Sequence, residues 1–435
     1  MFGANHKWAF FPSGAFAWRI GNEGFMQGQS LFSDLKLRLS YGTVGNQAVA
    51  PYQSLSRLGV AWYSAGSTEI PALAPGGGMP NPDLKWEQKT ELNVGIDASL
   101  LNNRVTLSLD AYHAKTTDLL LSVPVPSTTG FSSQLRNIGS LQNRGVELTL
   151  STVNVQRGAL SWRSTLNIAA NRNKVLDLGG QREILLAPRT GNFFSPAETY
   201  IVRVGEPLGS IYGYQVSGLW QPGDRCYLKN PLDCTPGEYK MVDQNTIDTN
   251  GDGKPDRPDS VITAADRVIL GYGDPKFYGG LSNTFTYGRF SLDLFFSFNY
   301  GNKIINAGNA YGGLAIGQAN ERATVLDRWT PTHTNTDVPR ANAGRPRRLY
   351  STLVEDGSYV RLQTLTLGYE LPAGLIPGTE SARLFLTGQN LVTATDYSGF
   401  DPDVNSMGGD PRFGGIDIGA YPHSRVWNFG VSVNF

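Results

Sequence analysis

The sequence lacks any run of about 18 apolar residues, so it contains no candidate transmembrane helix. Charged residues make up only 17%, against roughly 25% in soluble domains. The formal net charge is 0, which gives no sign of a nucleic-acid partner. The four histidines, His6, His113, His333 and His423, are too scattered to form a metal-ligand motif. These shortages argue against a helical membrane protein, a zinc protein and a nucleic-acid binder.

Motifs of catalysis are also missing. The chain has no Gly-x-Ser-x-Gly elbow and no phosphate-cradling Gly-Lys-Ser or Gly-Lys-Thr. Carboxylate pairs such as Asp401 and Asp403 are common in solvated loops and define no site by themselves. We therefore predict that the chain is not an enzyme, with a hydrolase built on exposed loops as the remaining alternative.

What the sequence does contain is strict alternation of apolar and polar residues. In 91–100 and 291–300, apolar residues occupy every second position, and the same holds for the terminal segment 426–435. A tilted strand needs about 9–11 residues to cross a bilayer, and strands in lipid must close into a barrel to satisfy their backbone groups. The pattern predicts an all-β, transmembrane antiparallel barrel with its apolar faces toward lipid.

About thirteen strands are predicted from alternation and turn residues. They are 9–20, 33–43, 88–100, 104–117, 143–153, 158–173, 198–204, 209–220, 277–287, 290–301, 357–370, 381–394 and 425–435. Short links at 101–103, 154–157, 205–208 and 288–289 separate long ones, with moderate links at 21–32 and 371–380. The long links are 44–87, 118–142, 174–197, 221–276, 302–356 and 395–424. Short turns on one side and long loops on the other are typical of outer-membrane barrels.

An odd strand number does not suit a complete bacterial barrel, which has an even number of strands. The segment Met1–Lys7 also lacks the charged and apolar regions of a secretory signal. Both observations lead us to expect that the sequence is the carboxyl-terminal part of a longer barrel protein.

A series of short motifs resembles the SusC/RagA family of TonB-dependent outer-membrane transporters. The series runs in the same order along almost the whole chain: Phe11-Pro12-Ser13, Trp18-Arg19-Ile20, 35–42, Gly45-Asn46-Gln47, 81–87, Asn137-Ile138-Gly139, 143–147, 205–209, Arg328-Trp329-Thr330-Pro331, 357–362, 388–391, 397–402 and Tyr421-Pro422. Each motif alone is a weak signal, and their order makes the resemblance specific.

The resemblance implies energised import of large nutrients, oligosaccharides or peptides, across the bacterial outer membrane. It further implies a SusD-like surface lipoprotein and TonB as partners, and a barrel of about 22 strands around a plug. The plug and the TonB-contacting segment are not recognisable in 1–435. The alternative is an ungated porin-like channel or a surface ligand-binding barrel without energy coupling.

The polar segment 221–276 carries two candidate structural sites. Cys226 and Cys234 could close a disulfide in an oxidising compartment, the alternative being two free thiols. Asp248, Asn250 and Asp252 stand at positions 1, 3 and 5 of an EF-hand-like opening, with Gly at position 6.

The opening suggests a structural calcium ion with two possible completions. Direct spacing uses the Lys254 carbonyl, Asp256 and Asp259, whereas the family pattern resembles a loop that closes with Asp266. An ion-free, Asx-rich turn is the alternative.

Two aromatic features complete the predictions. Trp427, Phe429, Val431, Val433 and Phe435 look like the carboxyl-terminal signal that outer-membrane assembly machinery reads. Loop aromatics could stack on sugar rings, although packing or a role at the lipid interface is the favoured interpretation. They include Trp62, Tyr63, Phe193, Phe194, Tyr311 and Tyr397.

Overall fold

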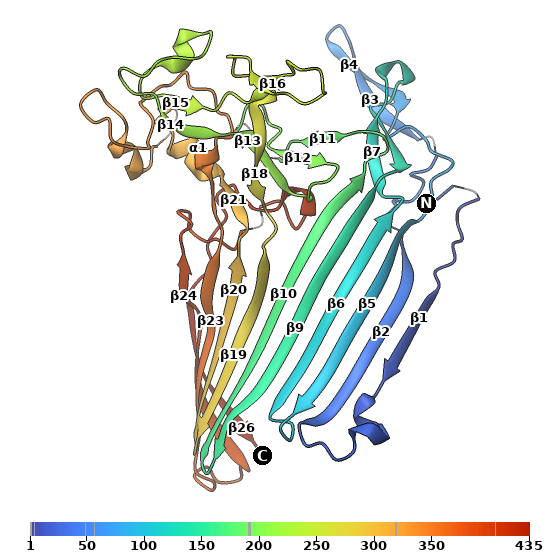
Figure 1. The fold of residues 1–435 in the computed structure, drawn as a ribbon, viewed down its shortest axis with the longest axis vertical. Coiled ribbons are helices and arrows are strands. Elements are labelled where there is room, and N and C mark those ends of the chain that lie inside the picture. The colour runs from blue at the N-terminus through green and yellow to red at the C-terminus, as the bar shows by residue number, and fades with distance from the viewer. Residues whose placement is uncertain are drawn as a thin grey trace. The chain divides into compact units, whose positions relative to one another are not determined.

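The computed structural model describes the chain at residues 2–3, 5–47, 49–55, 57–189, 193–317, 320–404 and 406–435 (Figure 1). Strands and loops dominate, and α1 (Ala307–Gly312) is the α-helix found in these ranges. No helix in the described part of the chain is long and apolar enough to cross a membrane. The chain divides into two compact units, the first formed by Met1–Thr152 and Asn171–Arg182, the second by Val153–Ala170 and Glu183–Phe435.

The long strands form an 11-stranded sheet, here called the wall, in the order β1-β2-β5-β6-β9-β10-β19-β20-β23-β24-β26. This order follows the chain, runs linearly from β1 to β26 and does not close. Their bounds are β1 (Ser13–Trp18), β2 (Phe32–Asn46), β5 (Glu87–Leu100), β6 (Val105–Thr117), β9 (Ser140–Arg157), β10 (Leu160–Asp177), β19 (Phe277–Tyr287), β20 (Phe290–Tyr300), β23 (Tyr359–Glu370), β24 (Ser381–Thr395) and β26 (Val426–Asn434).

Neighbouring strands within each unit pair antiparallel. In the first unit Leu37 on β2 faces Ile96 on β5, and in the second Leu281 on β19 faces Phe296 on β20. Because residues directly opposite point to the same side of a sheet, each register aligns the apolar residues on one face. The predicted all-β, antiparallel and incomplete barrel wall is confirmed.

Two predicted strands do not belong to the wall. Segments 198–204 and 209–220 form β12 (Tyr200–Arg203), β13 (Ser210–Tyr214) and β14 (Val216–Leu219), and the first two lie in a separate sheet, β11-β12-β13-β18. Their assignment to the wall is wrong for a physical reason. β13 is buried at every position, so it lies inside a water-excluded core, whereas a wall strand presents one face to lipid.

The predicted link at 154–157 is also wrong, because β9 continues to Arg157 and the turn falls at Gly158 and Ala159. Gly158 has φ 56°, a left-handed conformation that glycine adopts without strain. The links 174–197 and 221–276 prove to be parts of one connection, which leaves β10 at Asp177 and reaches β19 at Phe277.

The first unit joins its wall strands through hairpins. Short turns lie at one end of the unit, and two small hairpins lie at the other (Figure 1). A small cluster of Phe2, Val49 and Leu84 is buried beneath them. The elements are η1 (Ile20–Asn22), η2 (Gly24–Met26), β3 (Leu58–Ala65), β4 (Thr68–Pro75), β7 (Leu120–Pro124), η3 (Ser127–Thr129) and β8 (Ser133–Asn137).

In the second unit the connections 183–276, 301–358 and 396–425 fold together into what we call the loop layer. One of its small sheets, β22-β21-β25, joins two of these connections, because β21 pairs with β25. Its elements are β11 (Glu183–Leu186), β12, β13, β14, η4 (Pro231–Cys234), β15 (Tyr239–Met241), β16 (Asn245–Ile247), β17 (Arg257–Pro258), η5 (Ala264–Asp266), β18 (Arg267–Tyr272), β21 (Lys303–Asn306), α1, η6 (Ala323–Asp327), η7 (Ser351–Leu353), β22 (Val354–Asp356), η8 (Pro411–Phe413) and β25 (Ile416–Asp417).

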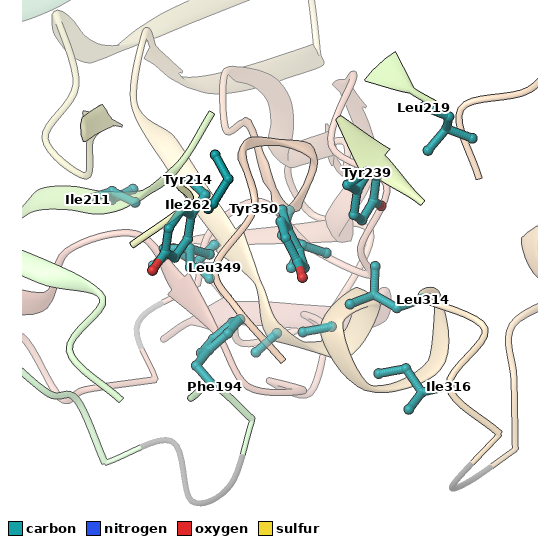
Figure 2. Packing of buried hydrophobic residues seen from close by; sticks show 14 of the residues in the cluster. Phe194, Ile211, Tyr214, Leu219, Tyr239, Ile262, Leu314, Ile316, Leu349 and Tyr350 are labelled. Carbon is teal, nitrogen blue, oxygen red and sulfur yellow. The ribbon is translucent and has the colours of Figure 1, made fainter. Parts of the chain in front are cut away.

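The loop layer has a hydrophobic core of its own. Figure 2 shows buried side chains of this core from two of the connections, among them Ile211 and Tyr239 from 183–276 and Leu314 from 301–358. Ile305 and Ile416, partners in the parallel pairing of β21 with β25, are buried in the same cluster. The loop layer is therefore a folded body with a core of its own.

Candidate functional site

The wall of the first unit has one apolar and one polar face. Leu92, Val94 and Ile96 on β5 are between 39% and 42% exposed, as expected for side chains that face lipid rather than a protein core. On the other face the Arg38 Nε atom donates to Asp97 Oδ2 at 2.8 Å, and its Nη2 donates to Asp110 Oδ2 at 2.8 Å. One arginine thus links three strands of the polar face.

A glycine makes this link possible. Gly95 lies between Arg38 and Asp110 in the strand register. A Cβ atom at Gly95 would lie 2.7 Å from Arg38 Cζ and 2.6 Å from Asp110 Oδ1. The guanidinium therefore passes directly over the β5 backbone.

The second unit uses the same arrangement. Arg383 on β24 donates from Nη2 to Ser291 Oγ on β20 at 2.8 Å. A Cβ atom at Gly368, on the intervening β23, would lie 2.5 Å from each of these two atoms. Both polar faces are thus held by arginines that cross a glycine.

On the other face of the second unit, Val360, Leu386 and Val392 are exposed. Leu292, Leu294 and Phe296 on β20 are partly exposed, so they do not lie in a water-excluded interior. The apolar side of β20 is accessible, as predicted.

A buried ion pair ties the loop layer to the wall strand β23. Arg361 is 3% exposed, and its Nη2 donates to Asp401 Oδ1, which lies in the connection after β24. Arg361 Nε donates to Thr393 Oγ1 at 3.0 Å. His423 completes the cluster, since its Nδ1 lies 2.8 Å from Asp401 Oδ2 and 3.1 Å from Arg361 Nη1.

The electrostatics of this cluster favour the charged carboxylate. Burial of Asp401 opposes ionisation, but hydrogen bonds from the Asp403 amide and from His423, together with the Arg361 charge, outweigh it and lower the Asp401 pKa below its ordinary value. The pair is shielded from water on both sides. Removal of one partner would therefore leave a buried, uncompensated charge.

Two further contacts fix the same connection. The Tyr397 hydroxyl donates to Asp417 Oδ2 at 2.7 Å, and both residues are buried. Burial, together with this hydrogen bond and the Asp417 charge, raises the Tyr397 pKa. Glu355 Oε2 accepts from the Ser398 amide at 2.8 Å, and its Oε1 accepts from Asn306 Nδ2 at 2.9 Å. The motif 397–402 is thus a set of anchoring residues.

Cys226 and Cys234 form a disulfide in the structure, with their Cα atoms 5.6 Å apart. Both sulfurs pack at the edge of the loop-layer core. The bridge closes the turn that precedes β15, next to Trp220, which is fully buried.

The predicted calcium residues form the opening turn but do not gather into one site. Asp248 accepts from the Gly251 amide at 2.7 Å and from the Gly253 amide at 2.8 Å, and Gly253 has φ 82°. The Asn250 and Asp252 side chains cap the next amides, those of Asp252 and Lys254. Backbone hydrogen bonds from Gly253 and Gly251 lower the Asp248 pKa.

The proposed closing residues are held elsewhere. Asp256 accepts from Thr249 Oγ1 at 2.7 Å, and Asp259 accepts from the Val261 amide at 2.8 Å. Asp266 is buried and caps η5, accepting from the Thr263 amide at 2.6 Å. Among the described residues no three Asp, Glu, His or Cys side chains come together as a metal-binding group. The seven-member donor set therefore does not fit a preformed site, and calcium binding stays a prediction.

The carboxyl-terminal strand keeps the predicted alternation. Trp427, Phe429 and Val431 on β26 are exposed, Val433 is partly buried, and Phe435 follows the last strand residue. These side chains are free of the loop-layer core, as a signal read by another protein requires.

The loop aromatics divide into two groups. Phe194 and Tyr397 are buried in the second unit, so they have a packing role. Trp62 and Tyr63, on the first unit's β3, are exposed, as is Tyr311 on α1. Phe193 is partly buried against the loop-layer core and meets the Tyr311 ring edge-on, so packing describes these residues too, and the role of the exposed Trp62 and Tyr63 stays a prediction.

Sequence reasoning missed Arg361 and His423 as partners of Asp401. The motifs 357–362 and 397–402 were both singled out by the resemblance, but their contact joins residues 40 positions apart. No local spacing reveals such a contact. An arginine in the middle of a strand pattern was the available signal, because a buried charge needs a partner.

The geometry defines a class of protein: an antiparallel barrel wall with one apolar and one polar face, carrying a folded loop layer. The TonB dependent receptor-like, beta-barrel family model matches residues 2–391. The chain belongs to this family of TonB-dependent receptors, which confirms the resemblance found in the sequence.

Two of the similar proteins illustrate the relationship. The chain is 36% identical over 442 residues to TonB-dependent receptor P3 of Formosa agariphila, with 100% of the chain and 42% of the relative aligned. It is 28% identical to TonB-dependent receptor SusC of Bacteroides thetaiotaomicron, over 100% of the chain and 41% of that protein.

Solved structures show the same fold. The structure of the RagAB peptide transporter superposes with a TM-score of 0.80 at 28% identity, covering 100% of the chain and 44% of the compared chain. The RagAB peptide importer in its open-open state gives a TM-score of 0.76. The chain thus spans less than half the length of the relatives that it matches.

Proposed function

We propose that the chain is part of the wall of an importer in the bacterial outer membrane, energised by TonB, for large nutrients such as oligosaccharides or peptides. The observation that carries this proposal is the match of the whole chain, at a TM-score of 0.80, to the RagAB peptide transporter. The polar face of the wall suits a water-filled lumen, and the apolar face suits lipid.

The proposal assigns residues 1–435 to the carboxyl-terminal part of the barrel. The connections near 44–87, 118–142, 174–197, 221–276, 302–356 and 395–424 then lie on the extracellular side. A SusD-like lipoprotein would cover this side, and TonB would act through the part of the transporter outside this sequence. SusC and RagAB support this arrangement by similarity.

The test uses the full-length protein that carries this chain in its native host. Deletion should abolish growth on one class of nutrient, oligosaccharides or peptides, and complementation should restore it. Loss of TonB should have the same effect as the deletion. Uptake that continues without TonB would instead indicate an ungated channel, and unchanged growth on both classes would reject nutrient import.

We also infer that the final strand is read by the outer-membrane assembly machinery. Deletion of Phe435, which is 87% exposed and contributes nothing to a described core, should lower the yield of folded protein in the membrane. Asn434→Ser is the matched control, because it keeps the terminal aromatic residue. Heat-modifiable migration on gels measures folded yield, and equal yields for both variants would contradict this role.

A further inference from the structure

An apolar groove opens on the wall of the second unit, where four strands meet the loop layer. Its volume is about 470 Å³. Phe277 contributes from β19, Phe298 and Tyr300 from β20, Val360 from β23 and Ala394 from β24. The remaining lining residues, Asn299, Ser358, Tyr359, Thr395 and Asp396, lie at strand ends. The groove is therefore apolar along its length and polar at one end.

The strand register explains its floor and sides. Phe298 faces Val360, and Val360 faces Ala394, so these three residues stand in one row on one face. Ala394 is the smallest of the three and leaves a depression beside Val360. On the other side, a Cβ atom at Gly279 would lie 2.9 Å from Phe298 Cζ, so the ring lies over bare backbone.

Stacked rings form the wall of the groove nearest to the loop layer. The Phe277 and Tyr300 rings are 4.9 Å apart and nearly parallel, at 24°. Phe277 also meets Phe298 edge-on, with ring centroids 6.3 Å apart. The hydroxyl-bearing ring of Tyr300 is half exposed at the strand end. Such an amphipathic ring is suited to the boundary between hydrocarbon and water.

The groove continues the face of the wall that should contact lipid. Val360 is 51% exposed, and Val392 is exposed in the next row of the same face. The Arg361 cluster lies on the polar face of β23, opposite to Val360, because successive side chains of a strand point to opposite faces. A polar nutrient in the lumen would therefore not reach this groove.

We propose that the groove seats one acyl chain of a membrane lipid, with its head group at the polar strand ends. A hydrocarbon chain gains most from a channel of apolar atoms that is shielded from water. The one charged side chain in the lining, Asp396, lies at the polar end, where the head group would sit. Because the groove continues the exposed apolar face of the wall, its proposed occupant is a membrane lipid rather than a protein partner. The inference rests on the proposed position of the wall in the outer membrane.

The experiment uses the full-length protein, reconstituted in phosphatidylethanolamine and phosphatidylglycerol vesicles with a trace of phosphatidylglycerol that carries a photoreactive acyl chain. Crosslinked peptides are mapped by mass spectrometry. We expect crosslinks to be several-fold enriched at 298–300 and 358–360 over the rest of the apolar face. Ala394→Phe, which fills the depression from an exposed position, should remove the enrichment.

Leu386→Phe is the matched control. It lies on β24, is exposed on the apolar face away from the groove, and should leave the enrichment unchanged. Uniform crosslinking along the whole apolar face would overturn the proposed lipid site, and so would an enrichment that survives Ala394→Phe. Absence of crosslinks from every wall strand would instead overturn the membrane position itself. Heat-modifiable migration verifies that both variants are folded.

Discussion

The long connections of the two units differ in how much apolar surface they bury. In the first unit, β3 and β4 form a hairpin whose Leu58, Val60 and Trp62 are about two-thirds exposed. In the second unit, three connections share a core in which Ile305 and Ile416 are almost fully buried. A two-stranded hairpin is marginal alone because it has nothing to bury its faces against. A connection becomes rigid only when others supply the second layer.

Truncation of a core residue should show this difference most strongly. Ile305→Ala removes buried methyl groups and should destabilise the loop layer by about 2–5 kcal/mol. Val60→Ala in the exposed hairpin should change stability by less than about 0.5 kcal/mol. Limited proteolysis of the folded protein measures both. Similar cleavage rates for the two variants would mean that the loop layer has no cooperative core.

The buried ion pair should give an effect of similar size. Asp401→Ala leaves the Arg361 charge buried and should cost about 3–5 kcal/mol. Asp34→Ala, which breaks the exposed pair with Arg19 in the first unit, should cost about 0–1 kcal/mol. The readout is the rate at which a protease cleaves 396–425. If this connection stays protected in Asp401→Ala, the ion pair does not anchor it.

The same pair predicts a pH dependence. The Asp401 pKa is lowered in the folded state from an ordinary value of 3.8. Its stabilising contribution is therefore complete above that value and is lost as the pH falls through the folded pKa. An acid protease should cleave 396–425 faster as the pH drops below 3.8, and Asp401→Asn should flatten this part of the profile.

The disulfide should contribute less. Replacing Cys226 and Cys234 with serine reopens a short ring, for which chain entropy gives about 2–3 kcal/mol. We expect faster cleavage around 221–240 while the rest of the loop layer keeps its protection. Reduction of the wild type provides the control. Release of the whole loop layer would show that the bridge holds more than its own turn.

Calcium should have the smallest effect. The opening turn at Asp248 is exposed, so an ion there would be completed largely by water and bound weakly. Asp252→Ala should increase cleavage of this loop more when calcium is present than when it is chelated, because the side chain also caps the Lys254 amide without the ion. Asp266→Ala should increase it with or without calcium, since Asp266 caps η5. If calcium and chelator give the same pattern in the wild type, the segment is only a polar turn.

The wall could be predicted from the sequence because its information is local. Alternation at 91–100 and 291–300 specifies a strand with two different faces, and turn residues mark its ends. The strand predicted at 198–204 contains β12, and the one predicted at 209–220 is in fact two strands, β13 and β14; all three lie outside the wall. Short apolar segments look alike whether lipid or protein covers them, so sequence periodicity cannot distinguish these environments.

The anchoring residues could not be predicted for a related reason. Arg361 and Asp401 each have ordinary sequence neighbours, and only the fold brings them together. Gly95 and Gly368 read as typical strand interruptions, yet each makes room for an arginine that crosses to a third strand. A contact that joins three strands cannot be read from the residue spacing along a single strand.

The parallel pairing of β21 with β25 has a consequence for the time at which the protein becomes rigid. Ile305 meets Ile416 just before the final strand, and the Tyr200 hydroxyl donates to the Gly414 carbonyl 214 residues later in the chain, at 2.9 Å. Wall hairpins join neighbours and can form as soon as both strands exist, whereas contacts of such separation form slowly. The loop layer therefore cannot close before residues 414–416 have been made, so it matures later than the wall hairpins that precede them.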